Sequence, residues 1–161
     1  ACSGDVEEVE KGGNESESLA KLVIPAAIVV DYQTLNLEEK IEVVQKENQE
    51  DGSIVLKLTE ADKKSALDQT EIVFNEVSKT VSIAKDKSKI RAFSHNDSYT
   101  ELRFTVSNQE VVEEESYKNM EELLIVNALL HQLLNEQQLE VRIHVYQEGA
   151  TDPFINKSLG K

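Results

Sequence analysis

The feature that most constrains the fold is a long apolar helical pattern over residues 116–136, followed almost at once by an alternating strand pattern. The stripe comprises Met120, Leu123, Leu124, Ala128, Leu130, His131 and Leu134, and is widened by Ile125, Val126, Leu129 and Leu133. A stripe this wide predicts a helix that is largely buried. After the short connection 136–138, the apolar residues of 139–146 occupy every second position, which predicts a strand with one buried face. So short a connection folds the strand back against the helix, so the chain must contain a sheet packed on a helix.

A second alternating segment lies upstream of this helix. Leu102, Phe104 and Val106 are apolar and the residues between them are polar, which predicts a strand over 101–106 with these three side chains inward. We expect residues 90–93 to form the other arm of a hairpin, across a turn at 95–98.

The N-terminal half gives weaker signals. The β-branched run around Pro25 predicts a strand on the C-terminal side of the proline, and Asp51-Gly52 predicts a hairpin whose return strand is 54–58. Thr59 followed by acidic residues predicts the start of a helix running from Glu60 to about Glu76, although 73–77 could equally be strand. A short strand is expected at 81–83.

Together these elements predict the α+β class, with a mixed or antiparallel sheet packed against two helices, the long one near 116–136. We expect a flexible tether over residues 1–20, which are acidic and rich in Gly and Ser, and a single domain over 21–148. Residues 149–161 are expected to be a polar, loosely held C-terminal tail.

Charge and composition narrow the functional classes. The net charge of −14 would repel a phosphate backbone, and the lack of Trp together with four Tyr and four Phe leaves few stacking platforms, so we expect no nucleic-acid partner. Partners attracted by charge would be basic proteins or cations. No apolar stretch approaches the roughly 20 residues that span a bilayer.

Cys2 is the one cysteine in the chain, and small residues and then the acidic Gly/Ser-rich run follow it. This pattern is typical of a processed bacterial lipoprotein, in which the cysteine carries acyl chains. It predicts lipidation of Cys2, attachment to the cell membrane through that lipid, and an extracytoplasmic location. The alternative is an unmodified thiol.

No arrangement of residues indicates catalysis. The three histidines, His95, His131 and His144, lack the spacing of a zinc site, and no nucleophile motif or phosphate-binding glycine loop is present. The acidic runs 113–115 and 121–122 lack a calcium-loop pattern and read as solvated charge. Carboxylate pairs of the glycosidase kind stay open, because acids are plentiful. We therefore expect no enzyme activity, no cofactor and no metal site.

The C-terminal half resembles the sporulation and spore-germination GerM domain family. The resemblance rests on the strand 101–106, the acidic spacer 113–116, the helix around 123–134 and the last strand, which reads Val141-x-Ile143-x-Val145 with Gly149 following. It implies an extracytoplasmic domain that acts through protein–protein contacts in a sporulation, germination or envelope assembly. It transfers no functional residue, because the pattern consists of apolar positions.

Two functional hypotheses remain. The first is a lipid-anchored interaction module with an unidentified envelope protein partner, whose contact surface would include the outward face of the last strand, Arg142, His144 and Tyr146. The second is a lipoprotein that binds a solute, a cation or a cell-wall fragment, which requires a concave pocket with converging polar side chains.

Overall fold

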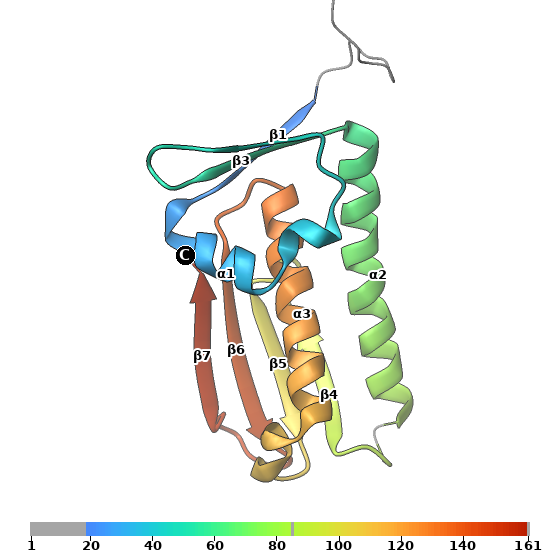
Figure 1. Cartoon of the computed structure of the whole chain (residues 1–161). Coiled ribbons are helices and arrows are strands. Elements are labelled where there is room, and N and C mark those ends of the chain that lie inside the picture. The colour runs from blue at the N-terminus through green and yellow to red at the C-terminus, as the bar shows by residue number, and fades with distance from the viewer. Residues whose placement is uncertain (1–18, 85, 161) are drawn as a thin grey trace, which may run out of the picture.

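The fold has two sheets and belongs to the α+β class, as the sequence predicts (Figure 1). The computed structural model describes residues 19–84 and 86–160. The small sheet contains β1 (Ala20–Ile24), β2 (Gln45–Asn48) and β3 (Ile54–Leu58), in the order β1-β3-β2. The large sheet contains β4 (Ile90–His95), β5 (Glu101–Val106), β6 (Glu140–Gln147) and β7 (Ile155–Gly160), in sequence order. One apolar core cluster extends through both parts.

The large sheet is mixed. β4 and β5 form an antiparallel hairpin, β6 and β7 form another, and β5 runs parallel to β6. The parallel pair requires a crossover, and α3 (Glu115–Leu134), preceded by the short 3-10 helix η5 (Gln109–Glu113), supplies it. Leu102, Phe104 and Val106 of β5 are fully buried, which confirms the predicted inward face of this strand.

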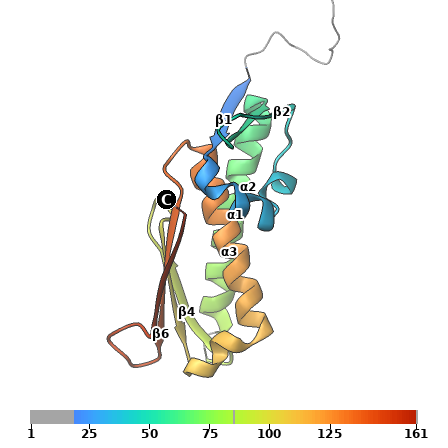
Figure 2. The same cartoon turned by 60° about the vertical axis from the view of Figure 1, so that its left-hand side comes forward.

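Two helices cover one face of the large sheet, α3 and the longer α2 (Glu60–Ala84) (Figure 1). α3 agrees with the predicted helix 116–136 to within two residues at either end. Its C-terminal half, 124–134, is buried on every side because the sheet, α2 and the segment 26–40 surround the helix (Figures 1 and 2). In the first half Tyr117 is buried, whereas Leu123, expected in the buried stripe, is exposed. This enclosure explains why the apolar stripe is so wide.

α2 begins where its cap predicts and ends later than expected. The Thr59 Oγ1 accepts a hydrogen bond from the Asp62 N–H at 3.0 Å, which satisfies one of the free donors of the first turn. The helix continues to Ala84, so residues 73–77 are helical and the strand expected at 81–83 is wrong. Phe74 and Val81 share the buried face of the helix, and helical spacing accounts for both without a strand.

The strand expected after Pro25 is also wrong, because the strand lies before the proline. β1 alternates buried and exposed residues, and Pro25 then caps the 3-10 helix η3 (Ala26–Ile28). The chain continues through α1 (Val29–Thr34) and the 3-10 helix η4 (Leu37–Lys40). Proline lacks the N–H that a ladder requires, yet its fixed φ suits a helix start, so the strand ends there. Four inward side chains hold the segment on the core: Ile28, Tyr32, Leu37 and Ile41.

The predicted hairpin at Asp51-Gly52 is confirmed by the antiparallel pairing of β2 and β3. Gly52 has a φ of +93°, a conformation that suits glycine, and the Asp51 carboxylate accepts hydrogen bonds from the Ser53 N–H and hydroxyl. These two bonds hold the pKa of Asp51 below its usual value.

The C-terminal region requires a correction. Residues 155–160, expected to belong to a loose tail, form β7 and pair along β6. The Lys157 ammonium contacts the Glu121 carboxylate of α3 at 2.9 Å, and Ile155 and Leu159 pack at the margin of the core. The last residue of the predicted tether 1–20 belongs to β1, which begins at Ala20, and residues 1–18 lie outside the described residues.

Candidate functional site

The three side chains predicted to form a contact surface lie together on the outward face of β6. Arg142, His144 and Tyr146 alternate with Val141, Ile143 and Val145, which are fully buried toward the helices. Among the described residues, no helix covers this outward face of the large sheet (Figure 2). We call this surface the open face; the side chains of β5 and β6 that line it are Glu101, Arg103, Thr105, Glu140, Arg142, His144 and Tyr146.

The arginines of the chain are concentrated on this sheet. The sequence contains three, and they lie one each on β4, β5 and β6: Arg91, Arg103 and Arg142. Arginine and tyrosine are enriched at protein interfaces, whereas lysine and glutamate are depleted there. Although the net charge of the chain is −14, the open face therefore carries two of its three arginines, Arg103 and Arg142.

Two of the arginines have carboxylate partners. The Arg142 Nη2 lies 3.4 Å from the Glu101 Oε2 and its Nε lies 3.6 Å from the Glu140 Oε2. The Arg91 Nε lies 3.4 Å from the Glu148 Oε1, just beyond the end of β6. Pairs this exposed stabilise a fold by at most about 1 kcal/mol each, so their main effect is to fix where the guanidinium groups lie.

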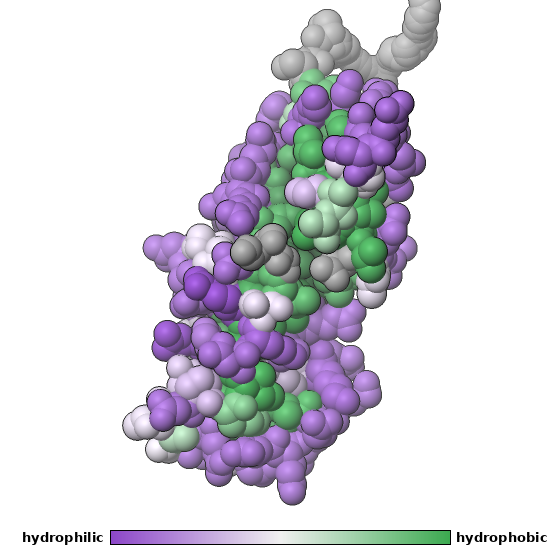
Figure 3. Space-filling model, turned by 90° about the vertical axis from the view of Figure 1, so that its left-hand side faces the viewer, coloured by the Kyte–Doolittle hydropathy of each residue, from purple (hydrophilic) through white to green (hydrophobic). Residues whose placement is uncertain are grey.

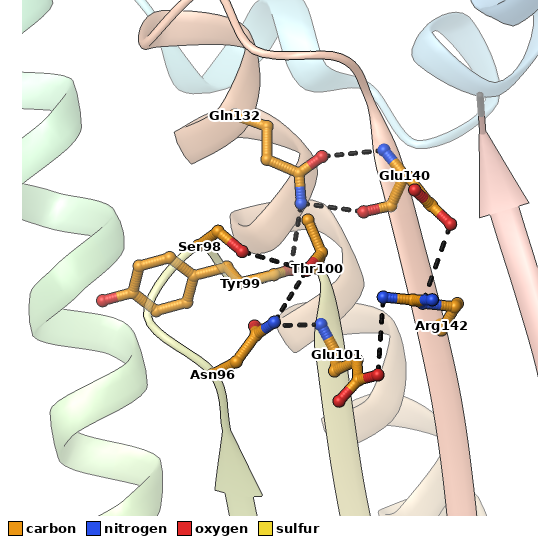
Figure 4. Close-up of polar contacts among 8 residues, drawn as sticks. All are labelled: Asn96, Ser98, Tyr99, Thr100, Glu101, Gln132, Glu140 and Arg142. Carbon is orange, nitrogen blue, oxygen red and sulfur yellow. Dashed lines mark hydrogen bonds and ion pairs between the residues drawn. The ribbon is translucent and has the colours of Figure 1, made fainter.

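A buried glutamine determines how β6 meets β5 (Figure 4). Gln132, in the last turn of α3, is fully buried. Its Nε2 donates to the carbonyl oxygens of Tyr99 and Glu140, at 2.9 Å each, and its Oε1 accepts from the Glu140 N–H at 2.8 Å. The Arg142 N–H then donates to the Thr100 carbonyl at 2.8 Å. Gln132 therefore fixes the start of β6 beside the start of β5, which places Arg142 next to Glu101.

The turn that enters β5 is ordered by its own side chains (Figure 4). The Asn96 Oδ1 accepts from the Glu101 N–H at 3.1 Å, and its Nδ2 donates to the Thr100 hydroxyl at 2.7 Å. Tyr99 has a φ of +62°, which is uncommon for a residue with a side chain. Its ring packs against the rings of His95, His131 and Phe74, with centroid distances of 4.4–4.6 Å. This packing holds the turn in its left-handed conformation.

The histidines do not form a common site. His95 and His131 belong to the aromatic cluster between the helices and the large sheet, whereas His144 lies on the open face. The His131 Nε2 lies 3.5 Å from a Glu71 carboxylate oxygen. Within 19–84 and 86–160, no group of three or more His, Cys, Asp or Glu side chains is arranged to hold a metal ion.

Two hollows bear on the binding hypotheses. The first has a volume of about 350 Å³ on the open face; Ser94, Arg103, Thr105 and Tyr146 line it, together with Gly149 and Ala150 of the β6–β7 loop. That loop projects from the open face (Figure 2).

The second hollow is a more enclosed pocket of about 270 Å³ between β1, η3 and the α3–β6 connection, and we call it the apolar pocket. Its apolar lining consists of Val23, Pro25, Ala27, Ile28, Leu133 and Leu139. Figure 3 views that side of the molecule and shows apolar surface gathered over its upper half.

Sequence reasoning correctly placed Arg142, His144 and Tyr146 on the outward face of the last strand, and it missed Gln132 and the aromatic cluster. The available signal for Gln132 was its place inside an apolar run, where it follows His131 between Leu130 and Leu133. The signal for Arg103 was its outward position in a strand whose other face is apolar. Cys2 lies outside the described residues.

Among the helices described, none is both long and apolar enough to cross a membrane. Comparison of the chain with protein-family models, with curated proteins and with solved structures gave no match.

Proposed function

We propose that the chain is a lipid-anchored, extracytoplasmic protein-interaction module. Cys2 carries the lipid that attaches it to the cell membrane, and the open face binds an envelope protein partner. The proposal includes no catalytic step. The GerM resemblance suggests the setting, an assembly of the envelope or of sporulation and germination.

One observation carries the proposed binding role: the composition of the open face. It concentrates Arg103, Arg142, His144 and Tyr146 on a sheet surface left uncovered by the described helices. A sheet usually buries at least one face, and a second face that stays in water is normally an ordinary mixture of polar residues. Here lysine is missing from the outward positions of β5 and β6, and these positions hold two arginines and a tyrosine beside Glu101 and Glu140. Arginine and tyrosine are two of the residue types enriched at protein interfaces.

The anchor is tested by the intact mass of the N-terminal peptide from the membrane fraction of the native host. A diacylglyceryl mass on Cys2 is expected. An unmodified thiol in the soluble fraction would remove the anchor from the proposal.

The open face is tested by partner capture from solubilised envelope with Arg142→Ala and Tyr146→Ala. Both variants should reduce the captured partner without changing the thermal midpoint, because both side chains are partly solvent-exposed and the ion pairs of Arg142 are weak. Lys79→Ala, on the exposed side of α2, is the matched control. Equal capture by the two variants and the control would refute the role of the open face.

The apolar pocket favours a second candidate, a solute-binding lipoprotein. Its lining is mostly apolar and also includes Lys21, Glu136, Gln137 and Gln138, so the pocket suits a small, mainly apolar molecule that carries a polar group. Ala27→Trp would fill this pocket, and Ala61→Trp adds the same bulk at an exposed position in the first turn of α2, outside both hollows. An apolar fluorescent probe displaced by the first substitution and retained by the second would support this candidate; equal probe binding by both variants would count against it.

A further inference from the structure

We propose that the hollow around Arg103 binds a carboxylate group of an acidic segment in the partner protein. This inference rests on the proposed function, since it specifies what the open face recognises. It identifies Arg103 as the residue that selects the partner.

Arg103 is the arginine whose charge is left uncompensated. Among the described residues it forms no ion pair, in contrast to Arg91 and Arg142. Its register neighbours are Ser94 on β4 and His144 on β6, and neither carries a negative charge. The nearest outward carboxylate along its own strand, Glu101, is already paired with Arg142. An exposed guanidinium in the middle of a sheet is therefore available to an external anion.

The surroundings of Arg103 supply further hydrogen-bond donors. The hydroxyl-bearing residues Ser94, Thr105 and Tyr146 line the same hollow. The projecting β6–β7 loop, with Gly149 at a φ of +89° and open space where a side chain would lie, forms one wall (Figure 2). A planar guanidinium binds a carboxylate through two parallel N–H···O bonds. Hydroxyl groups can then donate to the remaining lone pairs of the carboxylate oxygens.

The overall negative charge does not prevent this choice of partner. At physiological ionic strength the Debye length is about 8 Å, so acidic groups elsewhere on the surface are largely screened from the hollow. Glu101 and Glu140 on the open face, and Glu148 just beyond the end of β6, are each within 4 Å of an arginine nitrogen. Arg103 is the one charged residue among those that line the hollow, and Asp152 of the β6–β7 loop is exposed and lies outside the lining. The hollow therefore presents a positive group, which repels a basic segment and attracts an acidic one.

The test is an amide chemical-shift titration of the full chain carrying Cys2→Ser, so that lipidation does not affect the outcome. The probes are acetyl-Glu-Glu-Glu-Glu-amide and its glutamine counterpart. We expect shifts confined to β4, β5, β6 and the β6–β7 loop with the glutamate peptide, and none with the glutamine peptide. Arg103→Ala should weaken binding by about tenfold or more, as expected for the loss of a charge-assisted pair. Arg103→Lys should keep part of the affinity, because it keeps the charge but loses the fork of donors.

Lys79→Ala is the control and should bind as the parent does, because Lys79 lies on the helix layer. Unchanged affinity in Arg103→Ala, or shifts that map to lysines elsewhere, would overturn the inference. Binding of inorganic phosphate without binding of the peptide would overturn it as well. If peptide binding fails while Tyr146→Ala still reduces partner capture, the carboxylate inference is wrong and the interaction function stands.

Discussion

Replacement of Gln132 in α3 should strongly destabilise the junction between this helix and the large sheet. The side chain is fully buried and makes three hydrogen bonds, all to main-chain groups of Tyr99 and Glu140. At about 1 kcal/mol for each bond, Gln132→Ala should lower the free energy of unfolding by about 3 kcal/mol. For a domain of this size that corresponds to a fall of roughly 10 °C in the thermal midpoint.

The assay is urea unfolding followed by circular dichroism at 222 nm, with Gln69→Ala as the control. Gln69 lies on the exposed side of α2, so this change has the same helix-propensity term and removes no buried bond. A loss below about 1 kcal/mol for Gln132→Ala relative to the control would refute the reasoning, because it would mean that water replaces all three bonds.

Gln132→Glu extends the same test, because the unfolding free energy of this variant should depend on pH. A carboxylate at this position would face two carbonyl oxygens and could donate to neither, whereas its protonated form could donate to one. Burial and the carbonyl oxygens should raise the folded-state pKa above the unfolded value of about 4.3. The folded state then binds the extra proton, so stability should fall as pH rises from about 4.3 to that folded pKa and stay low above it. A variant with the same pH dependence as the parent chain would argue against a desolvated site.

Three further outcomes follow from particular contacts. Thr59→Ala should cost about 1 kcal/mol of unfolding free energy by removing the cap of α2, and Thr59→Ser should restore most of it, as measured by urea unfolding. Burial, together with the hydrogen bond to Glu121, raises the pKa of Tyr117 above its ordinary value; the folded state therefore keeps a proton that the unfolded state loses above about pH 10, and stability should fall above that pH. Tyr117→Phe should cost about 1 kcal/mol at pH 7 and flatten the decline in stability between pH 9 and pH 11, and equal slopes in the two chains would contradict the assignment. Glu121→Ala should remove the partner of both Tyr117 and Lys157, so amide exchange in β7 should accelerate while exchange in the β4–β5 hairpin stays unchanged.

The sequence predicted correctly those helices and strands whose local residue pattern matches their burial in the folded chain. Residues 101–106 alternate cleanly and form a half-buried strand, and Thr59 stands before acidic residues and caps a helix. The long helix was recognisable because its apolar stripe matches three covering layers. The outward positions of Arg142, His144 and Tyr146 followed directly from strand alternation.

The failures have a common physical cause, which is tertiary context overriding local preference. Val29 and Val30 favour strands, yet they lie in α1 because Ile28 and Tyr32 must reach the core at helical spacing. β7 carries too little apolar alternation to be recognised, since it is an edge strand whose inward Lys157 forms an ion pair with α3. Gln132 follows another polar residue, His131, within the apolar run, and its role depends on two main-chain segments that meet it only in the folded chain.

The parallel pairing of β5 with β6 also has a consequence for how the chain folds. The large sheet consists of two hairpins of neighbouring strands, joined by one seam between segments that are separated in the sequence by η5 and α3. Each hairpin can form locally, but the parallel pairing of β5 with β6 can form only after α3, which lies between the two hairpins in the sequence, has packed. Formation of this pairing is therefore the slow, entropically costly step. Until then both hairpins expose an inner edge and an apolar face, the surfaces on which nascent chains aggregate. Because Gln132 sits at the end of α3 and bonds to both sides of the seam, arrival of the helix and closure of the sheet become a single event.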